Sequence, residues 1–485
     1  MSDISGLSVS GLIRSSRFIL IGNLLGKLST LVFIPIYSWL IDPTDFGVIF
    51  TIQAICSFLL IVAPLSVEVG VSRYYFEQKT VDDIKRMFSS SVISLFVLSG
   101  LFYSVLILMS GYVSDFFEFS NPLYLIFGFL YSFFGSFFPV GSALLLAEGK
   151  VKGVAVSTVI SNFLLVVFNL IFVFNFKDKI LGYILSYLVF YFVQFVLFWV
   201  VTRAYFQWLF DWHKVKLLYS YSVQFILSNV SGWLVALSDR VMLLKMVGSD
   251  AVGLYSAGYT IASGPNVIVN SINQAYVPYT YSVFSSNDKK RENELSMVMM
   301  ALFVLFSILF LGIVFFVEEI VLLLGPSYRD ADLVIRVVVF GYYFNALKLI
   351  VHNPLSYDVK MVKYKSFIWL FTAFLNVGLN FYFIPLFSFD GAAYATMFAF
   401  LVSLFPVYFL SQHTKRLKLD FKTPLLVLIL FSSLFVLSYL GIIEGLIIKS
   451  IAYLLFTGLI ISQNKVISGF FIIYIKKLMN GVCRF

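Results

Sequence analysis

Charged residues and cysteines are scarce in this sequence. Only 12% of its 485 residues are charged and 60% are apolar, whereas a soluble domain has about 25% charged and about 45–50% apolar residues. This combination excludes a soluble globular protein, and the high hydrophobicity also excludes a disordered chain. The two cysteines, Cys56 and Cys483, are too few for a disulfide framework or a zinc site. The three histidines lie far apart, so no metal-ligand cluster is indicated.

Polar stretches of domain size are also lacking, and long apolar runs take their place. Runs of roughly eighteen or more apolar residues predict about fourteen membrane-spanning helices. The first run has no cleavage site and is too long for a signal peptide, so we expect it to stay uncleaved. The sequence therefore predicts an all-α polytopic membrane protein. The predicted spans are 15–40, 46–72, 88–112, 122–147, 153–175, 180–202, 219–247, 252–282, 295–317, 331–352, 364–386, 389–410, 424–441 and 445–461.

The distribution of lysine and arginine predicts the orientation of these spans. With the N-terminus inside, 25 of the 34 basic residues fall on the cytoplasmic side, and only Lys177, Lys179 and Arg329 fall on the opposite side. The positive-inside rule then puts both termini in the cytoplasm. The net charge of +9 follows from this bias and does not indicate nucleic-acid binding. The aromatic segment Arg203–Leu218 is predicted to form an amphipathic helix in the cytoplasmic interface.

A weak internal repeat is present. Residues 41–48 resemble residues 247–254 at an offset of 206, and each segment joins two predicted spans. An even number of spans between the two segments gives halves of the same orientation, as in transporters built from two parallel lobes. The alternative is that two unrelated hairpins share the same turn chemistry. Two further pairs at similar offsets are Gly182 with Gly391 and Asn169 with Asn380.

This repeat predicts three parts of the chain. Residues 1–205 form an N-terminal lobe with spans one to six. Residues 206–411 form a C-terminal lobe with spans seven to twelve and the interfacial helix at its start. Residues 412–485 contain spans thirteen and fourteen and a cytoplasmic tail. The two lobes are expected to be pseudo-symmetric, and the last two helices lie outside the duplication.

Basic residues inside predicted spans are the most unusual feature, because each costs roughly 2.5–3.5 kcal/mol at the bilayer centre. Apart from acids at the very start of a span, the only acids inside spans are Glu68 and Asp239, so ion pairing among these residues is not expected to neutralise the set. Four of the cations are near span ends and can reach the headgroups, whereas the other two, Lys27 and Arg240, lie deeper. The six cations are Lys27, Arg240, Lys245, Arg336, Lys348 and Lys449.

We interpret the deep cations as the lining of a hydrated cavity that favours an anionic, phosphorylated cargo. Lys27 and Arg240 are the first candidates for phosphate binding, and Arg336 and Lys348 are the second. Asp239 and Arg240 are adjacent and are therefore expected on different faces of their helix. Two alternatives stay open: Glu68 or Asp239 pairs with the cations, or these acids carry a coupling proton. No cofactor is predicted besides such a proton or another coupling cation.

Several short motifs resemble those of a known family. They open or close predicted spans and include the turn of the internal repeat. Over about residues 14–411, their order and placement are similar to Wzx-type O-antigen flippases. These are polysaccharide biosynthesis membrane proteins of the multidrug/oligosaccharidyl-lipid/polysaccharide exporter superfamily. The motifs are Arg17-Phe18, Ile34-Pro35-Ile36-Tyr37, Asp42–Gly47, Val71–Tyr75, Ile384–Phe387 and Asp390–Thr396.

The resemblance implies a protein of the bacterial inner membrane with two six-helix lobes around a cationic cavity. Such a protein moves undecaprenyl-pyrophosphate-linked oligosaccharide, for O-antigen or a related surface polysaccharide, by alternating access. The two additional C-terminal helices resemble the lipid II flippase branch. The implied partners are the lipid-linked oligosaccharide, membrane lipids, and the polysaccharide polymerase and chain-length machinery.

Two other functions are alternatives to this one. A cation-coupled multidrug exporter of the same superfamily would need an acidic or apolar cavity, which the excess of cations in the spans disfavours. An integral-membrane glycan polymerase or ligase would need a sizeable outer loop with Arg or His, and no predicted outer connection is that long. Since no catalytic constellation is visible, the sequence predicts a transporter and not an enzyme.

Overall fold

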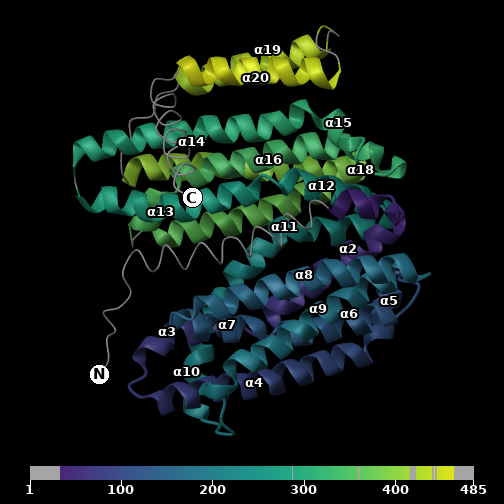
Figure 1. The fold of residues 1–485 in the computed structure, drawn as a ribbon, viewed down its shortest axis with the longest axis vertical. Coiled ribbons are helices and arrows are strands. Elements are labelled where there is room, and N and C mark those ends of the chain that lie inside the picture. The colour runs from purple at the N-terminus through teal and green to yellow at the C-terminus, as the bar shows by residue number, and fades with distance from the viewer. Residues whose placement is uncertain are drawn as a thin grey trace, which may run out of the picture. The chain divides into compact units, whose positions relative to one another are not determined.

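The computed structural model describes residues 33–286, 288–358, 361–414, 422–439, 442 and 445–463. Almost all of these residues are helical, and no strand occurs among them (Figure 1). This confirms the predicted all-α fold. Lys27 and the greater part of the first predicted span lie outside the described residues.

The helices follow one another with short connections. In the first half of the chain they are α2 (Pro43–Val62), α3 (Val67–Tyr74), α4 (Val81–Leu108), α5 (Ser110–Phe117), α6 (Leu123–Gly135), α7 (Phe138–Ala147), α8 (Val151–Asn175), α9 (Lys179–Thr202), α10 (Trp212–Ser222) and α11 (Ile226–Met246). In the second half they are α12 (Ser249–Ser263), α13 (Asn266–Ser286), α14 (Lys289–Phe315), α15 (Val317–Val321), α16 (Asp332–Val351), α17 (Asn353–Tyr357), α18 (Val362–Thr414), α19 (Lys422–Tyr439) and α20 (Leu446–Gln463).

Eight segments of the described chain are long and apolar enough to cross a membrane, which makes this a multi-pass membrane protein. The predicted number of fourteen stays a prediction. One reason is that several predicted spans contain a break: 252–282, for example, consists of α12 and α13. The break expected between spans 364–386 and 389–410 lies at Ser388, where φ is 55° and ψ is −134°, so α18 consists of two helices joined at this residue.

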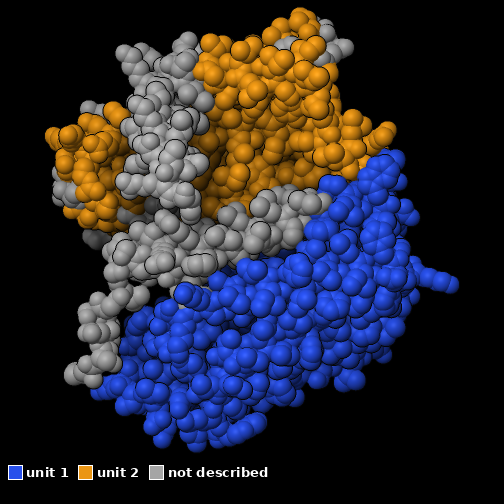
Figure 2. All heavy atoms as spheres, viewed as in Figure 1, with its two compact units in different colours: residues 1–257, 325–328, 376–392 blue, residues 258–324, 329–375, 393–485 orange. Residues whose placement is uncertain are grey.

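The chain divides into two compact units (Figure 2). Unit 1 contains residues 1–257, 325–328 and 376–392, and unit 2 contains residues 258–324, 329–375 and 393–485. Unit 1 therefore continues well beyond residue 205, where the predicted N-terminal lobe ends. A compact unit and a symmetry-related lobe are different divisions, so the two lobes stay a prediction.

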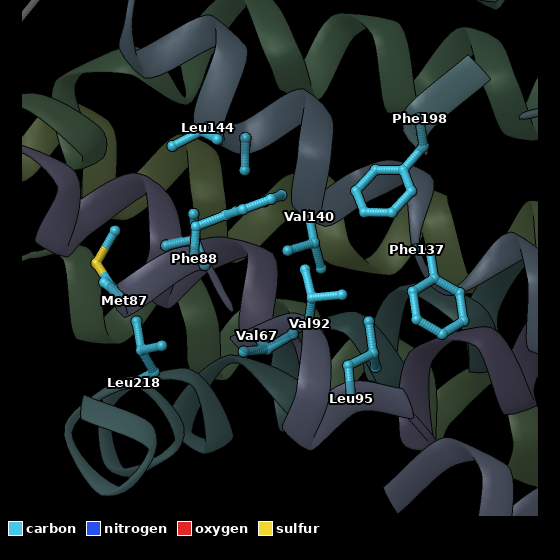
Figure 3. Packing of buried hydrophobic residues seen from close by; sticks show 12 residues of the cluster. Val67, Met87, Phe88, Val92, Leu95, Phe137, Val140, Leu144, Phe198 and Leu218 are labelled. Carbon is cyan, nitrogen blue, oxygen red and sulfur yellow. The ribbon is translucent and has the colours of Figure 1, made fainter. Parts of the chain in front are cut away.

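One apolar core of unit 1 lies around the first part of α4 (Figure 3). This helix carries a stripe of buried side chains at helical spacing, which is the pattern of an amphipathic packing face. Because lipid is as apolar as the core, van der Waals packing holds such helices together. The buried members of the core are Val67, Val71, Met87, Phe88, Val92, Leu95, Phe137, Val140, Ala143, Leu144, Phe198 and Leu218, from α3, α4, α7, α9 and α10 together with Phe137 at the start of α7.

Unit 2 includes the last helix pair. Helices α19 and α20 pack on α14, and α14 in turn packs on α16. The pair that the sequence puts outside the repeat is thus joined to unit 2 by an apolar cluster. Its buried members are Val304, Leu311, Phe315, Val427, Phe431, Leu434 and Ile460.

The predicted interfacial helix over 203–218 is wrong in its first part. After a short 3-10 turn at Arg203–Tyr205, residues 206–211 are not helical, and α10 begins only at Trp212. The side chain of Asp211 accepts hydrogen bonds from the backbone of His213 and Lys214, which caps α10 and fixes its start. Trp208 is 88% exposed, which fits an indole at a membrane interface.

Candidate functional site

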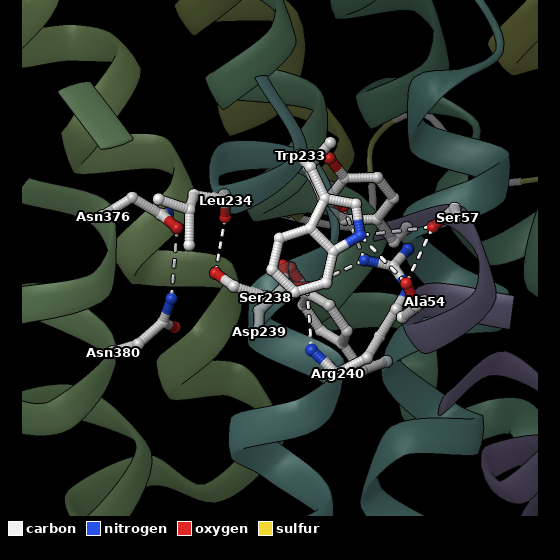
Figure 4. A network of polar contacts seen from close by, with 12 residues as sticks. Ala54, Ser57, Trp233, Leu234, Ser238, Asp239, Arg240, Asn376 and Asn380 are labelled. Carbon is white, nitrogen blue, oxygen red and sulfur yellow. Dashed lines mark hydrogen bonds and ion pairs between the residues drawn. The ribbon is translucent and has the colours of Figure 1, made fainter. Parts of the chain in front are cut away.

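The best-defined charged group inside a helix of unit 1 is the pair of Asp239 and Arg240 in α11 (Figure 4). The Asp239 and Arg240 side chains are 0% and 3% exposed, and Arg240 Nη1 lies 2.8 Å from Asp239 Oδ1. The same nitrogen donates to the carbonyl oxygen of Ala236, 2.8 Å away and one turn earlier. Adjacent residues leave a helix in different directions, as expected, but the inference that these two do not pair is wrong. The long guanidinium arm folds back along the helix and reaches the carboxylate.

Tyr255 of α12 completes this arrangement. Its hydroxyl donates to Asp239 Oδ2, and its ring centroid lies 5.5 Å from Arg240 Cζ. The carboxylate thus has a partner on each oxygen, and the guanidinium has an aromatic neighbour. A buried pair with such partners is neutral as a unit, whereas removal of one member leaves an uncompensated charge. The pair also ties α11 to α12.

A second polar contact in Figure 4 joins α11 to α2. The indole nitrogen of Trp233 lies 2.9 Å from the carbonyl oxygen of Ala54 and 3.2 Å from Ser57 Oγ. Nearby in the figure, Asn380 Nδ2 donates to Asn376 Oδ1 over 3.2 Å within α18. Side chains that hydrogen-bond between helices are typical of packed membrane segments.

Glu68 lies in α3, directly after a non-helical break between α2 and α3. Leu65 and Ser66 both have left-handed backbone angles, with φ of 53° and 56°, which is rare for residues other than glycine. Ser66 Oγ accepts a hydrogen bond from Asn229 Nδ2 of α11 at 3.1 Å, which holds the break in place. Glu68 itself is half-buried and forms no ion pair with the residues that the structure describes. Its predicted role in proton coupling stays a prediction.

Three of the cations near span ends pair with acids at the ends of neighbouring helices. Lys245 lies 3.4 Å from Glu118. The other two share a cluster in unit 2 that contains Glu318 and Glu319 of α15. The ion pairs of this cluster are Arg336 with Glu318 (3.3 Å) and Asp332 (3.8 Å), and Lys449 with Glu318 (2.8 Å) and Glu319 (3.0 Å).

These pairs correct the expectation that ion pairing leaves most of the cations in the spans unneutralised. The sequence count left out acids at and beyond span ends: Glu118 and Glu318 lie just outside the predicted spans, and Asp332 is the second residue of span 331–352. The hydrogen bond and charge of Lys449 hold the pKa of Glu318 below its usual value. The acidic doublet directly after span 295–317 was the sequence signal for this cluster, and it was missed.

Lys348 is the exception among the described span cations. Its side chain is 3% exposed, and no described acid forms an ion pair with it. Instead, Nζ lies 4.2 Å from the ring centroid of Trp369, 5.2 Å from that of Phe400 and 3.1 Å from Ser403 Oγ. We call Trp369, Phe400 and Ser403 the Lys348 cage. The sequence did not single out these three residues, since aromatic residues occur throughout the chain.

Comparison with known proteins adds the family. A family model described as polysaccharide biosynthesis protein matches residues 12–284, which is more than half of the chain. The chain is 24% identical over 279 residues to Lsg locus protein 1 of Haemophilus influenzae, covering 55% of this chain and 65% of that protein. It is 27% identical over 138 residues to the teichuronic acid biosynthesis protein TuaB of Bacillus subtilis, covering 27% and 28%. Each match spans less than two-thirds of the relative.

Solved structures match over nearly the whole chain. The lipid II flippase MurJ in an inward closed conformation gives a TM-score of 0.73 at 13% identity, covering 93% of this chain and 99% of that one. An inward-facing multidrug resistance transporter of the MATE family gives 0.62 at 13% identity, covering 84% and 95%. At such low identity these matches show a shared fold. It is a fold of flippases and transporters, and not of catalytic enzymes.

Proposed function

Because the chain belongs to the polysaccharide biosynthesis protein family, we propose that it is a flippase for a lipid-linked oligosaccharide. The observation that carries this proposal is the coincidence of that family with the fold of a lipid flippase over 93% of the chain. The cargo is an undecaprenyl-pyrophosphate-linked unit of O-antigen or a related surface polysaccharide. Several apolar helices and the flippase likeness make the protein a multi-pass membrane protein, consistent with the bacterial inner membrane.

The mechanism that we propose is alternating access. The prenyl tail stays in lipid while the pyrophosphate and its sugars pass through a cationic cavity. A doubly charged pyrophosphate is best held by lysine and arginine, because charge-assisted hydrogen bonds to phosphate oxygens are short and strong. Lys27 and Arg240 are the residues that we propose for this contact.

Arg240 needs a change of partner to take part. In the structure, the guanidinium forms an ion pair with Asp239 and donates a hydrogen bond to the carbonyl of Ala236. Phosphate oxygens offer the same bidentate geometry as a carboxylate and can compete for it. Of the second-tier candidates, Arg336 is paired with acids and Lys348 is enclosed by its cage. Neither is expected to touch the phosphates in this conformation.

A leaflet-accessibility assay tests the proposal directly. Purified protein is placed in vesicles that carry undecaprenyl-pyrophosphate-linked sugar on one side, and the fraction that becomes accessible on the other side is measured over time. Wild type is expected to transfer the lipid faster than empty vesicles do. No acceleration with any lipid-linked sugar, in protein that keeps its thermal transition, would refute the proposal.

Surface glycan in a flippase-null strain tests the two residues. Lys27→Ala and Arg240→Ala are expected to lose it, whereas Lys245→Ala, at the end of the same helix as Arg240, is expected to keep it. Arg240→Ala also leaves Asp239 buried without its cation. The double variant Asp239→Ala and Arg240→Ala restores neutrality and separates loss of phosphate binding from loss of folding. Full surface glycan in Lys27→Ala and in the double variant would discard the assignment.

A further inference from the structure

A lysine near a span end is expected to extend its ammonium to the headgroups, and Lys348 does not. It lies three residues before the end of α16, within reach of that end by length alone. Side chains of a helix lean toward its N-terminus, however, and so point away from this end. The Lys348 side chain is accordingly buried within unit 2, where Nζ meets the cage and not the helix end.

The cage provides partners for an ammonium without providing a negative charge. Ser403 donates its own hydroxyl hydrogen to the carbonyl of Phe400 at 2.8 Å, so its oxygen accepts from Lys348 Nζ. The faces of Trp369 and Phe400 attract a cation through their quadrupoles. This attraction offsets only part of the cost of a buried charge. A movement of either ring therefore shifts the balance between the charged and the neutral form.

The two rings come from the two helical parts of α18, which are joined at a non-helical residue. Trp369 precedes the non-helical residue Ser388 of α18, and Phe400 follows it. A change of conformation at this break would move one ring relative to the other. The proton affinity of Lys348 is thereby linked to the shape of α18.

Polar groups accompany Lys348 on its face of α16. Asn345 lies one turn earlier and His352 one turn later, a spacing that puts all three on one face. Asn345 Oδ1 and both polar atoms of the Asn353 side chain are buried and form no hydrogen bond within the described residues. Buried polar groups of this kind ordinarily bind water. Asn353 lies just beyond the end of α16 and Asn345 one turn before Lys348, so water held at these groups would flank the lysine on both sides.

The other titratable side chains on the elements packed against α16 have partners elsewhere or lie near its ends. None of those described forms an ion pair or a hydrogen bond with Lys348. They include Tyr259 of α12 (bonded to Tyr342), Tyr276 of α13 (to the carbonyl of Ile350), Glu292 and Glu294 at the start of α14, Glu318 and Glu319 of α15 (to Lys449), Tyr343 of α16 (to Ser307), His352 (to Ser356), Tyr357 of α17, and Tyr364, Asp390, Tyr394, Tyr408 and His413 of α18.

We propose that Lys348 is a proton-binding site, with the rings of Trp369 and Phe400 in the place of a counter-ion, and that it takes up and releases one proton in each transport cycle. The step is the conversion of the amine and a proton into the ammonium, and its reverse. The link to transport rests on the proposed function, whereas the proton site itself does not.

Competitive acetylation measures the proton site without any transport. Purified full-length protein is treated with limiting acetic anhydride between about pH 6 and pH 10, around the ordinary lysine range. Mass spectrometry then gives the labelled fraction at Lys348 and at the exposed Lys152. The labelling midpoint of Lys348 is expected at least one pH unit below that of Lys152. Trp369→Leu, which removes the nearer ring, is expected to lower it by about one further unit. Equal midpoints at Lys348 and Lys152, or no labelling of Lys348 at any pH, would overturn the proposal.

The link to transport is tested in vesicles with an imposed pH gradient. In wild type, the pH gradient is expected to change the rate of lipid transfer several-fold. Lys348→Met mimics the neutral form and Lys348→Arg keeps the charged form, so both variants are expected to lose this change in rate. A purely structural lysine would be replaced by arginine without this loss, and a retained response in Lys348→Arg would overturn the coupling. If the labelling result is as expected but wild type moves no lipid-linked sugar, the proton site stands and the proposed function fails.

Discussion

Gly47 of α2 packs on the first residue of α12, and Gly253 of α12 packs on the first residue of α2. A methyl group at Gly47 would overlap with the carbonyl oxygen of Ser249, the first residue of α12. A methyl group at Gly253 would overlap with the carbonyl oxygen of Pro43, the first residue of α2. The two glycines are 206 residues apart, and so are Pro43 and Ser249. The two segments that resemble each other in sequence thus pack on each other, and only glycine permits this approach.

Alanine at Gly47 or Gly253 is therefore expected to destabilise the protein. Each extra methyl group meets backbone, which cannot move aside as a flexible side chain can, so we expect a loss of about 1–3 kcal/mol. The thermal transition of the purified protein in detergent should fall for both variants. Gly232→Ala in α11 is the matched control, because no atom lies within 4 Å of its added methyl group. A transition unchanged in Gly47→Ala would contradict the close contact.

Substitutions at Asp239 and Arg240 should not be additive. Asp239→Ala or Arg240→Ala alone leaves a buried unpaired charge and is expected to cost about 3–5 kcal/mol. The double variant removes both charges and should be more stable than either single variant. Thermal transitions of the four proteins form a double-mutant cycle that measures the coupling. Additive losses would show that the two side chains do not interact as Figure 4 draws them.

Much of the fold could be predicted from the sequence, because apolar runs of span length allow little but helices in a membrane. Even the break at Ser388 falls between two predicted spans. The interfacial segment was harder to predict. Its aromatic residues suit either a helix or a loop. The loop is stabilised by hydrogen bonds that its backbone donates to α4: Gln207 N to Ser89 Oγ, and Asp211 N to Ser90 Oγ.

The candidate site was less predictable than the fold. Burial of Arg240 and Lys348 follows from their place in apolar runs, but their partners do not. Glu318 and Lys449 are 131 residues apart, and no local pattern indicates that α15 and α20 meet. The rings around Lys348 are two aromatic residues among many. Contacts of this kind depend on how helices pack, which composition and periodicity do not specify.

Glu318 should make stability depend on pH. Lys449 lowers the pKa of Glu318 in the folded protein, so the folded state holds the ionised form more strongly than the unfolded state does. Its contribution is present above the ordinary value of 4.5 and is lost as the pH falls below that value. The thermal transition of wild type should drop over this range. Glu318→Gln should show a smaller drop, whereas Glu294→Gln, an exposed residue of α14, should match wild type. An identical drop in Glu318→Gln would remove this carboxylate as its source.

The loop of residues 206–211 should put Trp208 among lipid headgroups. Its indole is 88% exposed, and tryptophan favours the membrane interface. In protein that keeps Trp208 as its only tryptophan, lipids brominated near the headgroup should quench the fluorescence strongly. A second protein that keeps only Trp233, whose indole is bonded to Ala54 within unit 1, should be quenched much less. Ser89→Ala with Ser90→Ala removes the two hydroxyls that hold the loop on α4, so quenching of Trp208 should become weaker and more variable with depth. Strong quenching of Trp208 by aqueous iodide, with none by brominated lipid, would put the loop in water and contradict an interfacial anchor.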